Sequence, residues 1–283
     1  MKLAIVTDST CDLTADQLAA LDVHRVHLYV SFQGQTHRDW IDITPKAIIE
    51  GVKGGAELPT TSQPSPEDFA AAYREAVTAG AEQILVITIS SAISGTYQSA
   101  NIAAEDAGVP VTLFDSKQAS IGIGNLVRIA AGMRDEGIGV EDVVRVLERT
   151  RDTMRVLFAV DTLDFLLKGG RVSRTSALIG GMLNIKPMLT LEDGKIVPAA
   201  RARGTKKAIA ELVTRLKSHA AAHPGPLVID FLHSQDVAAA ETLKRAVQDA
   251  GVQYEGGDVY EIGAVIAAHV GPGTFGFYAH VRP

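Results

Sequence analysis

The sequence contains very little cysteine and few aromatic residues. Cys11 is the one cysteine among 283 residues. A disulfide within the chain is therefore excluded, and the composition fits a reducing compartment such as the cytoplasm. Aromatic residues make up 5% of the chain, whereas hydrophobic residues make up 46%. We therefore expect an aliphatic interior, built mainly from Leu, Ile, Val and Ala.

The sequence also lacks an excess of positive charge and any long apolar run. Its 27 basic and 33 acidic residues give a formal net charge of −6, which disfavours nonspecific binding to nucleic acids or anionic membranes. No apolar stretch approaches the roughly 18 residues that a membrane-spanning helix needs. The apolar run Leu3–Val6 is too short for a secretory signal peptide. We expect a cytoplasmic protein that does not insert stably into membranes.

Sequence patterns of common catalytic and metal sites are missing. The absence of a G-x-x-x-x-G-K-[ST] loop disfavours a nucleotide kinase, and there is no G-x-S-x-G nucleophile elbow. The eight His residues include no H-E-x-x-H pattern and no pairing with Cys, so no metal is expected. Cys11 follows an expected strand and is a candidate reactive thiol, although a small buried residue is the simpler interpretation.

The first half of the sequence alternates apolar strands with amphipathic helices. Helix starts are marked by the capping box Thr14–Gln17 and by Pro45 and Pro66 at first helical positions. Strands that are apolar throughout, separated by helices, favour a parallel sheet covered on both faces. The expected strands are Leu3–Thr7, Val26–Phe32, Ile84–Ile89 and Val111–Phe114, and the later helices are Ser94–Ala107, Ala119–Arg134 and Glu141–Arg151.

The second half predicts a mixed α/β domain with an antiparallel component. Two apolar runs flank Glu192-Asp193-Gly194-Lys195, which is a hairpin signal, and Pro187 suits an edge strand. We place a domain boundary near Thr150–Thr153, giving an N-terminal domain of residues 1–152 and a C-terminal domain of residues 153–283. The expected strands are Val156–Val160, Ile185–Leu191, Ile196–Ala200, Leu227–Phe231, Tyr254–Glu261 and Phe275–Val281, with helices Thr205–His219 and Val237–Ala250.

Polar clusters follow three of the expected strands. They are Asp8-Ser9-Thr10, Ser90-Ser91 with Ser94, and Asp115-Ser116, and the run Thr60–Ser65 precedes a helix. In open parallel sheets, ligands bind beyond the carboxyl ends of the strands, and hydroxyl and N–H groups at helix starts favour a carboxylate or phosphate. Each Ser or Thr alone is more simply explained as a helix cap or turn. Taken together, the three loops are expected to converge on one edge of the first domain.

Two glycine-rich segments and a basic patch lie in the second half. Lys168–Ser173 is a candidate backbone anion nest. His269–Gly273 combines an imidazole with a tight loop, where glycines permit close approach of backbone or ligand. Arg201, Arg203, Lys206 and Lys207 form the patch, whose simplest explanation is the solvated start of a helix.

Six of these segments occur in an order that resembles the DegV family of bacterial fatty-acid-binding proteins. The likeness covers essentially the whole chain, and six motifs in sequence are far more specific than any one of them. The segments are Asp8–Leu13, Thr60–Pro66, Ser90–Ala100, Lys168–Ser173, Asn184–Pro187 and His269–Thr274.

The resemblance implies a DegV-like fold of two α/β domains with one acyl chain, such as palmitate, buried between them. It implies that Thr61 and Ser94, with Ser62 beside them, meet the fatty-acid carboxylate, and that His269 lies close by. It further implies a carrier without a cofactor, which presents the acid to a separate ATP-dependent fatty acid kinase. That kinase forms an acyl phosphate for phospholipid synthesis, and Arg171 and Arg203 look like its docking residues.

Two other functions remain open at the level of sequence. The protein is alternatively an acyl hydrolase or transferase that uses Ser94 or Cys11 as its nucleophile, or a regulatory protein that senses lipid. A carrier needs no catalytic base. It needs only an apolar tunnel and a hydrogen-bonded cradle for the carboxylate, because burying that group without partners costs several kcal/mol.

Overall fold

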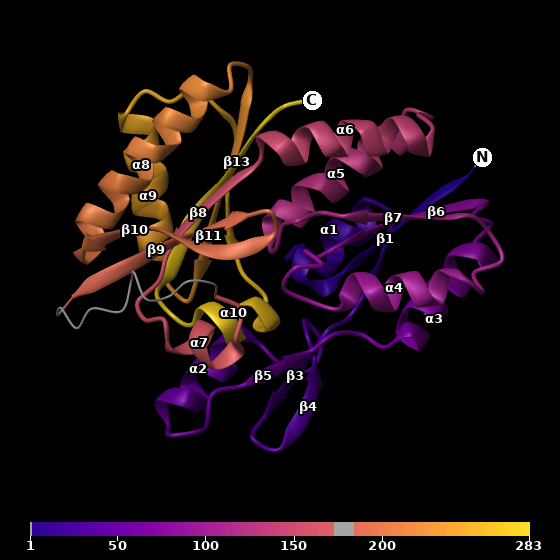
Figure 1. Ribbon diagram of the computed structural model, residues 1–283, viewed down its shortest axis with the longest axis horizontal. Helices are drawn as coiled ribbons and strands as arrows, with labels where there is room; N and C mark the ends of the chain where they lie inside the picture. Colours follow the sequence, from indigo (N-terminus) through magenta and orange to yellow (C-terminus); the bar gives the residue numbers. More distant parts are fainter. Residues whose placement is uncertain (1, 173–183) are drawn as a thin grey trace.

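The computed structural model describes residues 2–172 and 184–283, and it contains two main β-sheets (Figure 1). The first sheet has four strands in the order β2-β1-β6-β7, and all neighbouring pairs are parallel. The parallel sheet predicted for the first half is thereby confirmed. Its strands are β1 (Leu3–Asp8), β2 (Val23–Val26), β6 (Gln83–Thr88) and β7 (Val111–Asp115).

Helices cover both faces of this sheet. Ile84 and Val86 of β6 pack with α3 and α4 on one face, whereas Leu85 and Ile87 pack with α5 on the other. Successive side chains of a strand point to opposite faces, which explains why β6 is apolar throughout. The helices of this half are α1 (Ala15–Ala20), α2 (Pro45–Lys53), α3 (Pro66–Thr78), α4 (Thr96–Ala104), α5 (Ile121–Asp135) and α6 (Val140–Thr153).

The second sheet has six strands in the order β10-β9-β8-β13-β11-β12. All neighbouring pairs are antiparallel except β11 and β12, so the antiparallel component predicted for the mixed α/β second half is confirmed. Helices α8 (Gly204–Ala222) and α9 (Val237–Asp249) pack on one face. The strands are β8 (Arg155–Ala159), β9 (Ile185–Glu192), β10 (Lys195–Arg203), β11 (Leu227–Ser234), β12 (Glu255–Glu261) and β13 (Thr274–Val281).

The single strand predicted for Val26–Phe32 is wrong. The segment divides between β2 and a further strand, β3 (Tyr29–Phe32), which belongs to a separate antiparallel sheet. At the break, the Leu28 N–H donates to the Ser9 hydroxyl and the Leu28 carbonyl accepts from the Asp39 N–H. These tertiary hydrogen bonds replace the ladder of a continuous strand. The small sheet adds β4 (Gln35–Arg38) and β5 (Thr60–Ser62).

Two short helices were not anticipated from the sequence. They are α7 (Asp164–Gly169) and α10 (Ala264–Val270), which lie side by side (Figure 1), and α10 also contacts α2, β3 and β5. Six or seven residues are too few to show a helical repeat of apolar positions. The expectation that Pro187 marks an edge strand is also wrong, because β9 lies between β10 and β8.

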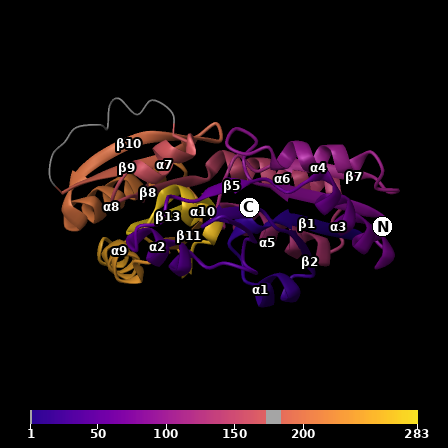
Figure 2. The same ribbon diagram turned by 90° about the horizontal axis from the view of Figure 1, so that it is seen from below.

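Side chains from both halves of the chain share the largest apolar core. Leu126 of α5 and Leu147 of α6 belong to the same cluster as Val156 of β8 and Tyr278 of β13. In Figure 2 the six-stranded sheet with α8 and α9 lies on the left and the parallel sheet lies on the right. The division into domains at residues 152 and 153 stays a prediction.

Candidate ligand-binding site

A cavity of about 410 Å³ lies where the two main sheets meet. This volume falls within the range of roughly 300–1,000 Å³ that is common for small-molecule sites. Its walls are largely aliphatic, and they include Ile93, Val156, Leu191, Ile196, Leu232 and Ile262. Polar side chains also reach the cavity, and these include Thr61, Ser62, Gln63, Ser94, Arg171 and His269. An apolar chamber with a few polar groups is suited to an amphipathic ligand.

Thr61 and His269 come from distant parts of the chain and contact each other in the cavity. Thr61 lies in β5, and His269 lies in the last turn of α10 instead of the loop that its neighbouring glycines suggested. The Thr61 hydroxyl oxygen lies 2.7 Å from Nε2 of His269. Both side chains are half-buried and line the cavity. The sequence identified both residues, and the structure joins them in one hydrogen bond.

The imidazole of His269 is held in its neutral form. Burial, followed by the nearby positive charge of Arg171, lowers the pKa of His269 from its usual value to about 4. Its Nδ1 atom is buried without a hydrogen-bond partner and faces Gly169. A buried N–H without an acceptor is rarer than an unpaired lone pair, so we infer that the proton resides on Nε2. His269 then donates to the Thr61 oxygen, which leaves the Thr61 O–H free to donate to a ligand.

Ser94 lies in the turn that precedes α4. Its hydroxyl lies 2.8 Å from that of Thr96 and accepts from the Thr96 N–H at 3.3 Å. The turn also places Gln63 against Gly95, where a Cβ atom would come within 2.0 Å of the Gln63 Oε1. Gln63 in turn donates to Ser99 at 3.0 Å. Gln63 is a cavity residue that was not singled out from the sequence, although it lies within one of the six motifs.

Arg171 reaches the polar part of the cavity from the segment after α7. Its guanidinium donates to the carbonyl of Gly169 at 2.5 Å and to that of Ile93 at 3.4 Å. The anion nest proposed for Lys168–Ser173 is wrong for the described part of this segment, because the N–H groups of Gly170 and Arg171 bond to carbonyls of α7. Ser173 lies outside the described residues.

Arg203 occupies a different environment. It ends β10, precedes α8 at the N-cap position and is exposed. Unlike Arg171, it is not one of the residues that line the cavity. The predicted docking role of Arg171 and Arg203 therefore involves one residue that lines the cavity and one on the exposed surface of the second half, at the end of β10.

The acidic motif after β1 serves as internal scaffolding and does not line the cavity. The Asp8 carboxylate accepts from the Ile89 N–H at 2.7 Å, which ties β1 to the end of β6. Asp12 accepts from the Gly263 N–H at 2.9 Å, and Asp39 accepts from the Val265 N–H at 3.2 Å. Burial raises the pKa of Asp12 and raises that of Asp39 to about 6. These two carboxylates hold the start of α10, which carries His269.

Cys11 is poorly suited to nucleophilic chemistry. Its side chain is completely buried. Burial raises the pKa of the Cys11 thiol to about 12, with smaller contributions from Asp8 and Asp12. The thiolate is the reactive form of cysteine, so this residue stays protonated and inert near neutral pH. The alternative of an acyl transferase that uses Cys11 loses its physical basis.

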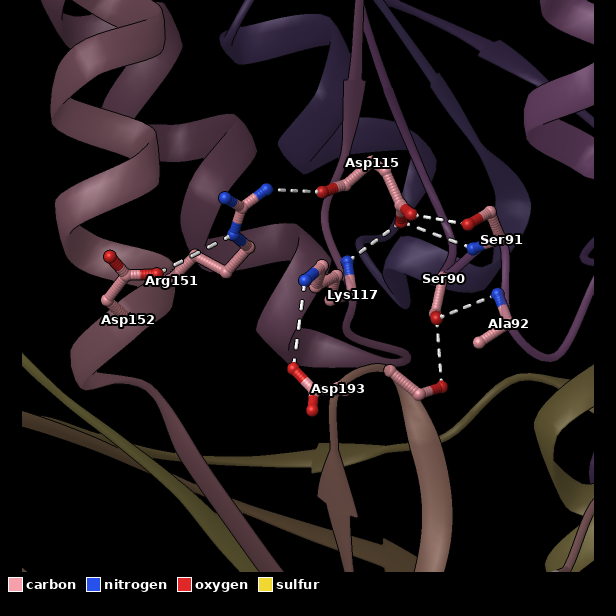
Figure 3. Close-up of polar contacts among 9 residues, drawn as sticks. Ser90, Ser91, Ala92, Asp115, Lys117, Arg151, Asp152 and Asp193 are labelled. Atoms are coloured by element: carbon pink, nitrogen blue, oxygen red, sulfur yellow. Dashed lines mark hydrogen bonds and ion pairs between the residues drawn. The ribbon is translucent and has the colours of Figure 1, made fainter.

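The hairpin formed by β9 and β10 is fastened over the cavity. Leu191 and Ile196 flank its turn and line the cavity. The buried Ser90 hydroxyl donates to the Gly194 carbonyl at 2.8 Å and accepts from the Ala92 N–H at 3.2 Å (Figure 3). The same loop continues to Ser94, whose N–H donates to the Ser90 carbonyl. Ser90 thus links the hairpin turn to the loop that carries Ser94.

A second set of contacts surrounds this junction on its solvent side. Asp115 accepts from the Ser91 hydroxyl at 2.5 Å and from the Lys117 N–H at 3.0 Å (Figure 3). The Lys117 ammonium lies 3.8 Å from Asp193 of the hairpin turn. Exposed ion pairs of this kind contribute about 0–1 kcal/mol. The buried hydrogen bond from Ser90 to Gly194 therefore contributes more to holding the hairpin turn against this loop than the ion pair does.

Among residues 2–172 and 184–283, none of the helices combines the length and the apolar composition that a membrane span requires. The same residues hold no group of three or more His, Cys, Asp or Glu side chains arranged to bind a metal ion.

Comparison with known proteins places the chain among relatives of one kind. A profile of the DegV family, described as uncharacterised proteins, matches residues 2–281. A DegV domain-containing protein of Deinococcus radiodurans is 41% identical over 98% of this chain and 97% of its own length. A protein of Thermotoga maritima named as a fatty acid-binding protein is 34% identical, with the same coverage of 98% and 97%.

The similarity extends to solved structures. The structure of a DegV family protein from Thermus thermophilus, described by its fatty acid binding, superposes with a TM-score of 0.95 at 45% identity, covering all of both chains. The Thermotoga and Thermus proteins are named for fatty acid binding and not as enzymes, in agreement with the expectation of a lipid-binding protein that is not a catalyst.

Proposed function

Because the chain belongs to the DegV family, we propose that it binds one long-chain fatty acid, such as palmitate, in the cavity between its two main sheets. The observation that carries the proposal is the Thr61–His269 hydrogen bond in the polar part of an otherwise aliphatic cavity. The hydroxyl and imidazole form a ready donor for a carboxylate, and the remaining walls suit an alkyl chain.

The head group is bound by Thr61 and Ser94, with Ser62 and His269 beside them. Thr61 donates its free O–H to one carboxylate oxygen, and Ser94 donates to the carboxylate from the turn before α4. Hydrogen bonds to a charged group contribute roughly 1.5–3 kcal/mol each. The Arg171 guanidinium adds a positive charge that favours the ionised acid over its neutral form.

The tail supplies most of the affinity. Each buried methylene contributes about 0.8 kcal/mol, so a C16 chain contributes on the order of 10 kcal/mol before the costs of binding. The aliphatic lining meets this chain without leaving buried polar groups unpaired. No reactive nucleophile is required for such a role.

The protein presents the bound carboxylate to a separate ATP-dependent fatty acid kinase in the cytoplasm. Two features support this part of the proposal. Ser62 is exposed while it lines the cavity, so the polar part of the cavity reaches the surface. Arg171 lines the same cavity, and Arg203 is exposed on the surface of the second half. The product is an acyl phosphate, which supplies phospholipid synthesis.

Fatty-acid retention by the purified protein tests the binding proposal. Native mass spectrometry should show one noncovalently held C14–C18 acid per chain. Combined Thr61→Ala and Ser94→Ala substitutions should weaken binding by about 3–6 kcal/mol, the sum of two hydrogen bonds to a charged group, measured by calorimetry. The matched control is Thr242→Ala with Ser218→Ala, because both hydroxyls bond within helices away from the cavity. Equal affinity of both double variants, or an acyl adduct on Ser94, contradicts the proposal.

A further inference from the structure

Gly122 and Tyr278 are in unusually close contact at the wall of the cavity. Tyr278 is 2% exposed and lines the cavity. Its hydroxyl donates to the Ala119 carbonyl at 2.5 Å, just before α5 begins. A Cβ atom on Gly122, in the first turn of α5, would lie 2.4 Å from Cε1 of the Tyr278 ring. The ring therefore occupies space that the side chain of any other residue at position 122 would fill.

The strand register places this contact away from the polar part of the cavity. Thr274 lines the cavity, and its hydroxyl donates to the Val270 carbonyl, next to His269. Tyr278 is four residues further along β13 on the same face, a distance of about 13 Å. On the neighbouring strand β8, Val156 lies opposite Tyr278 and also lines the cavity. Tyr278 and Val156 thus stand at the distal end of this wall.

We propose that the Gly122–Tyr278 contact sets the length of the acyl chain that the cavity accepts. The inference rests on the proposed function, because it assumes a fatty acid whose head lies at Thr61 and Ser94. The ring is pressed against the α5 backbone and tethered to Ala119. This arrangement keeps the tyrosine out of the space that the end of the tail would occupy.

The direction of the effect follows from which atoms are free to move. The backbone of Tyr278 is fixed on both sides, by Val156 of β8 and by Asp230 of β11. A methyl group on Gly122 therefore pushes the ring, and the open space beside the ring is the cavity. Gly122→Ala should shorten the accepted chain. Tyr278→Leu removes the ring and should lengthen it.

Competition among saturated acids tests this inference. The purified protein is incubated with equimolar C14, C16 and C18 acids, and the retained acids are quantified by mass spectrometry. One methylene changes affinity by about fourfold. The C14-to-C18 ratio should therefore rise about fourfold or more in Gly122→Ala and fall by a similar factor in Tyr278→Leu, relative to the unsubstituted protein.

Two control variants separate chain selection from general damage. Tyr73→Leu also removes a buried tyrosine whose hydroxyl donates to a carbonyl, that of Ala100, but Tyr73 does not line the cavity. Gly132→Ala adds a methyl group to α5 where no atom lies within 4 Å of it. Both controls should keep the C14-to-C18 ratio of the unsubstituted protein.

The outcomes distinguish this inference from the proposed function. If the unsubstituted protein retains no acid, the fatty-acid-binding proposal itself fails. If that protein retains acid and the ratio is unchanged in folded Tyr278→Leu, the length-setting role is wrong. A shifted thermal transition would reveal that Gly122→Ala fails to fold. In that case Tyr278→Leu and the milder Tyr278→Phe decide whether the length-setting role holds. Tyr278→Phe keeps the ring but loses its tether, so its ratio should shift toward C14.

Discussion

The imidazole of His269 packs directly on Gly169, and a Cβ atom at position 169 would lie 2.3 Å from its Nδ1 atom. This contact joins the end of α7 to the last turn of α10 and fixes the ring so that Nε2 meets Thr61. The presence of glycine at position 169 is thus explained by the close packing of His269 and not by the binding of an anion. The next residue, Gly170, has a φ of 66° and caps α7.

Gly169→Ala should weaken fatty-acid binding while the chain still folds. The added methyl group displaces the imidazole, and Thr61 loses the partner that orients its hydroxyl. We expect a loss of about 1–2 kcal/mol in binding, the order of one hydrogen bond, measured by calorimetric titration. Gly132→Ala is the control because nothing lies near its added methyl group. Equal affinities of the two variants would show that the His269 position is irrelevant to binding.

The tether between the hairpin and the first half predicts a coupled pair of substitutions. Gly194→Ala places a Cβ atom 2.1 Å from the Ser90 hydroxyl and also strains a residue with a φ of 75°. Ser90→Ala removes the clashing oxygen but leaves the Gly194 carbonyl without its donor, at a cost of about 1–3 kcal/mol.

Chemical denaturation should therefore show that the double variant loses less unfolding free energy than the two single losses added together. The coupling should be on the order of 1 kcal/mol. Strictly additive losses would mean that the two groups do not interact. Ser91→Ala, on the exposed side of the same loop, is the control and should not couple with Gly194→Ala.

Acid should destabilise the protein in part through His269. The pKa of His269 is lowered to about 4 in the folded protein, whereas an unfolded chain has a His pKa of about 6.5. Below pH 6.5 the unfolded state takes up a proton that the folded state excludes. The contribution of His269 to the free energy of unfolding is therefore fully present above pH 6.5. It is lost as pH falls toward 4, by up to about 3 kcal/mol.

This prediction is checked by comparing denaturation curves at pH 7 and pH 4.5. His269→Asn should lose less unfolding free energy over this interval than the unsubstituted protein does. A nuclear magnetic resonance titration should also find that bound fatty acid raises the pKa of His269, because a carboxylate stabilises the imidazolium. An identical pH dependence of the two proteins would contradict the assignment.

Arg171→Ala and Arg203→Ala should impair transfer to the kinase more than they impair folding. Arg203 is exposed, and truncating an exposed Arg typically changes stability by about 0.5 kcal/mol or less. Arg171 is half-buried, and its truncation also removes the hydrogen bonds to the carbonyls of Gly169 and Ile93. Because an interface hot spot costs 2 kcal/mol or more in binding, acyl-phosphate formation with kinase and ATP should fall at least about tenfold in both variants, with the melting temperature of Arg203→Ala nearly unchanged. Arg245→Ala on the exposed side of α9 is the control. Wild-type turnover in both test variants would place docking elsewhere.

Sequence motifs singled out Thr61, Ser94, Arg171 and His269, and all four line one cavity. The roles predicted for them, carboxylate binding for three of them and kinase docking for Arg171, stay predictions. Tyr278 was not singled out because it lies in a mostly apolar strand, where neither alternation nor a motif distinguishes it from its neighbours. Its importance depends on Gly122, more than 150 positions away in the sequence, and only the folded chain brings the two together.

The elements that sequence patterns missed are those defined by tertiary contacts. The break before β3 depends on the Ser9 hydroxyl, which accepts from Leu28 and donates to Asp39. Helix α10 is held at its start by Asp12 and Asp39, from the other half of the chain. The local sequence carries no information about these partners, because they are distant along the chain. The parallel sheet, by contrast, could be predicted because its strands are apolar on both faces.

The position of β13 constrains how the protein is made. This strand contains residues 274–281, yet it occupies the interior of the six-stranded sheet, between β8 and β11. It also contributes Thr274 and Tyr278 to the cavity. A nascent chain that has emerged only as far as residue 273 has a gap in that sheet and an incomplete cavity. The proposed loading with fatty acid therefore follows synthesis of residues 274–281, and β8, which also pairs with β9, gains its second neighbouring strand only at that stage.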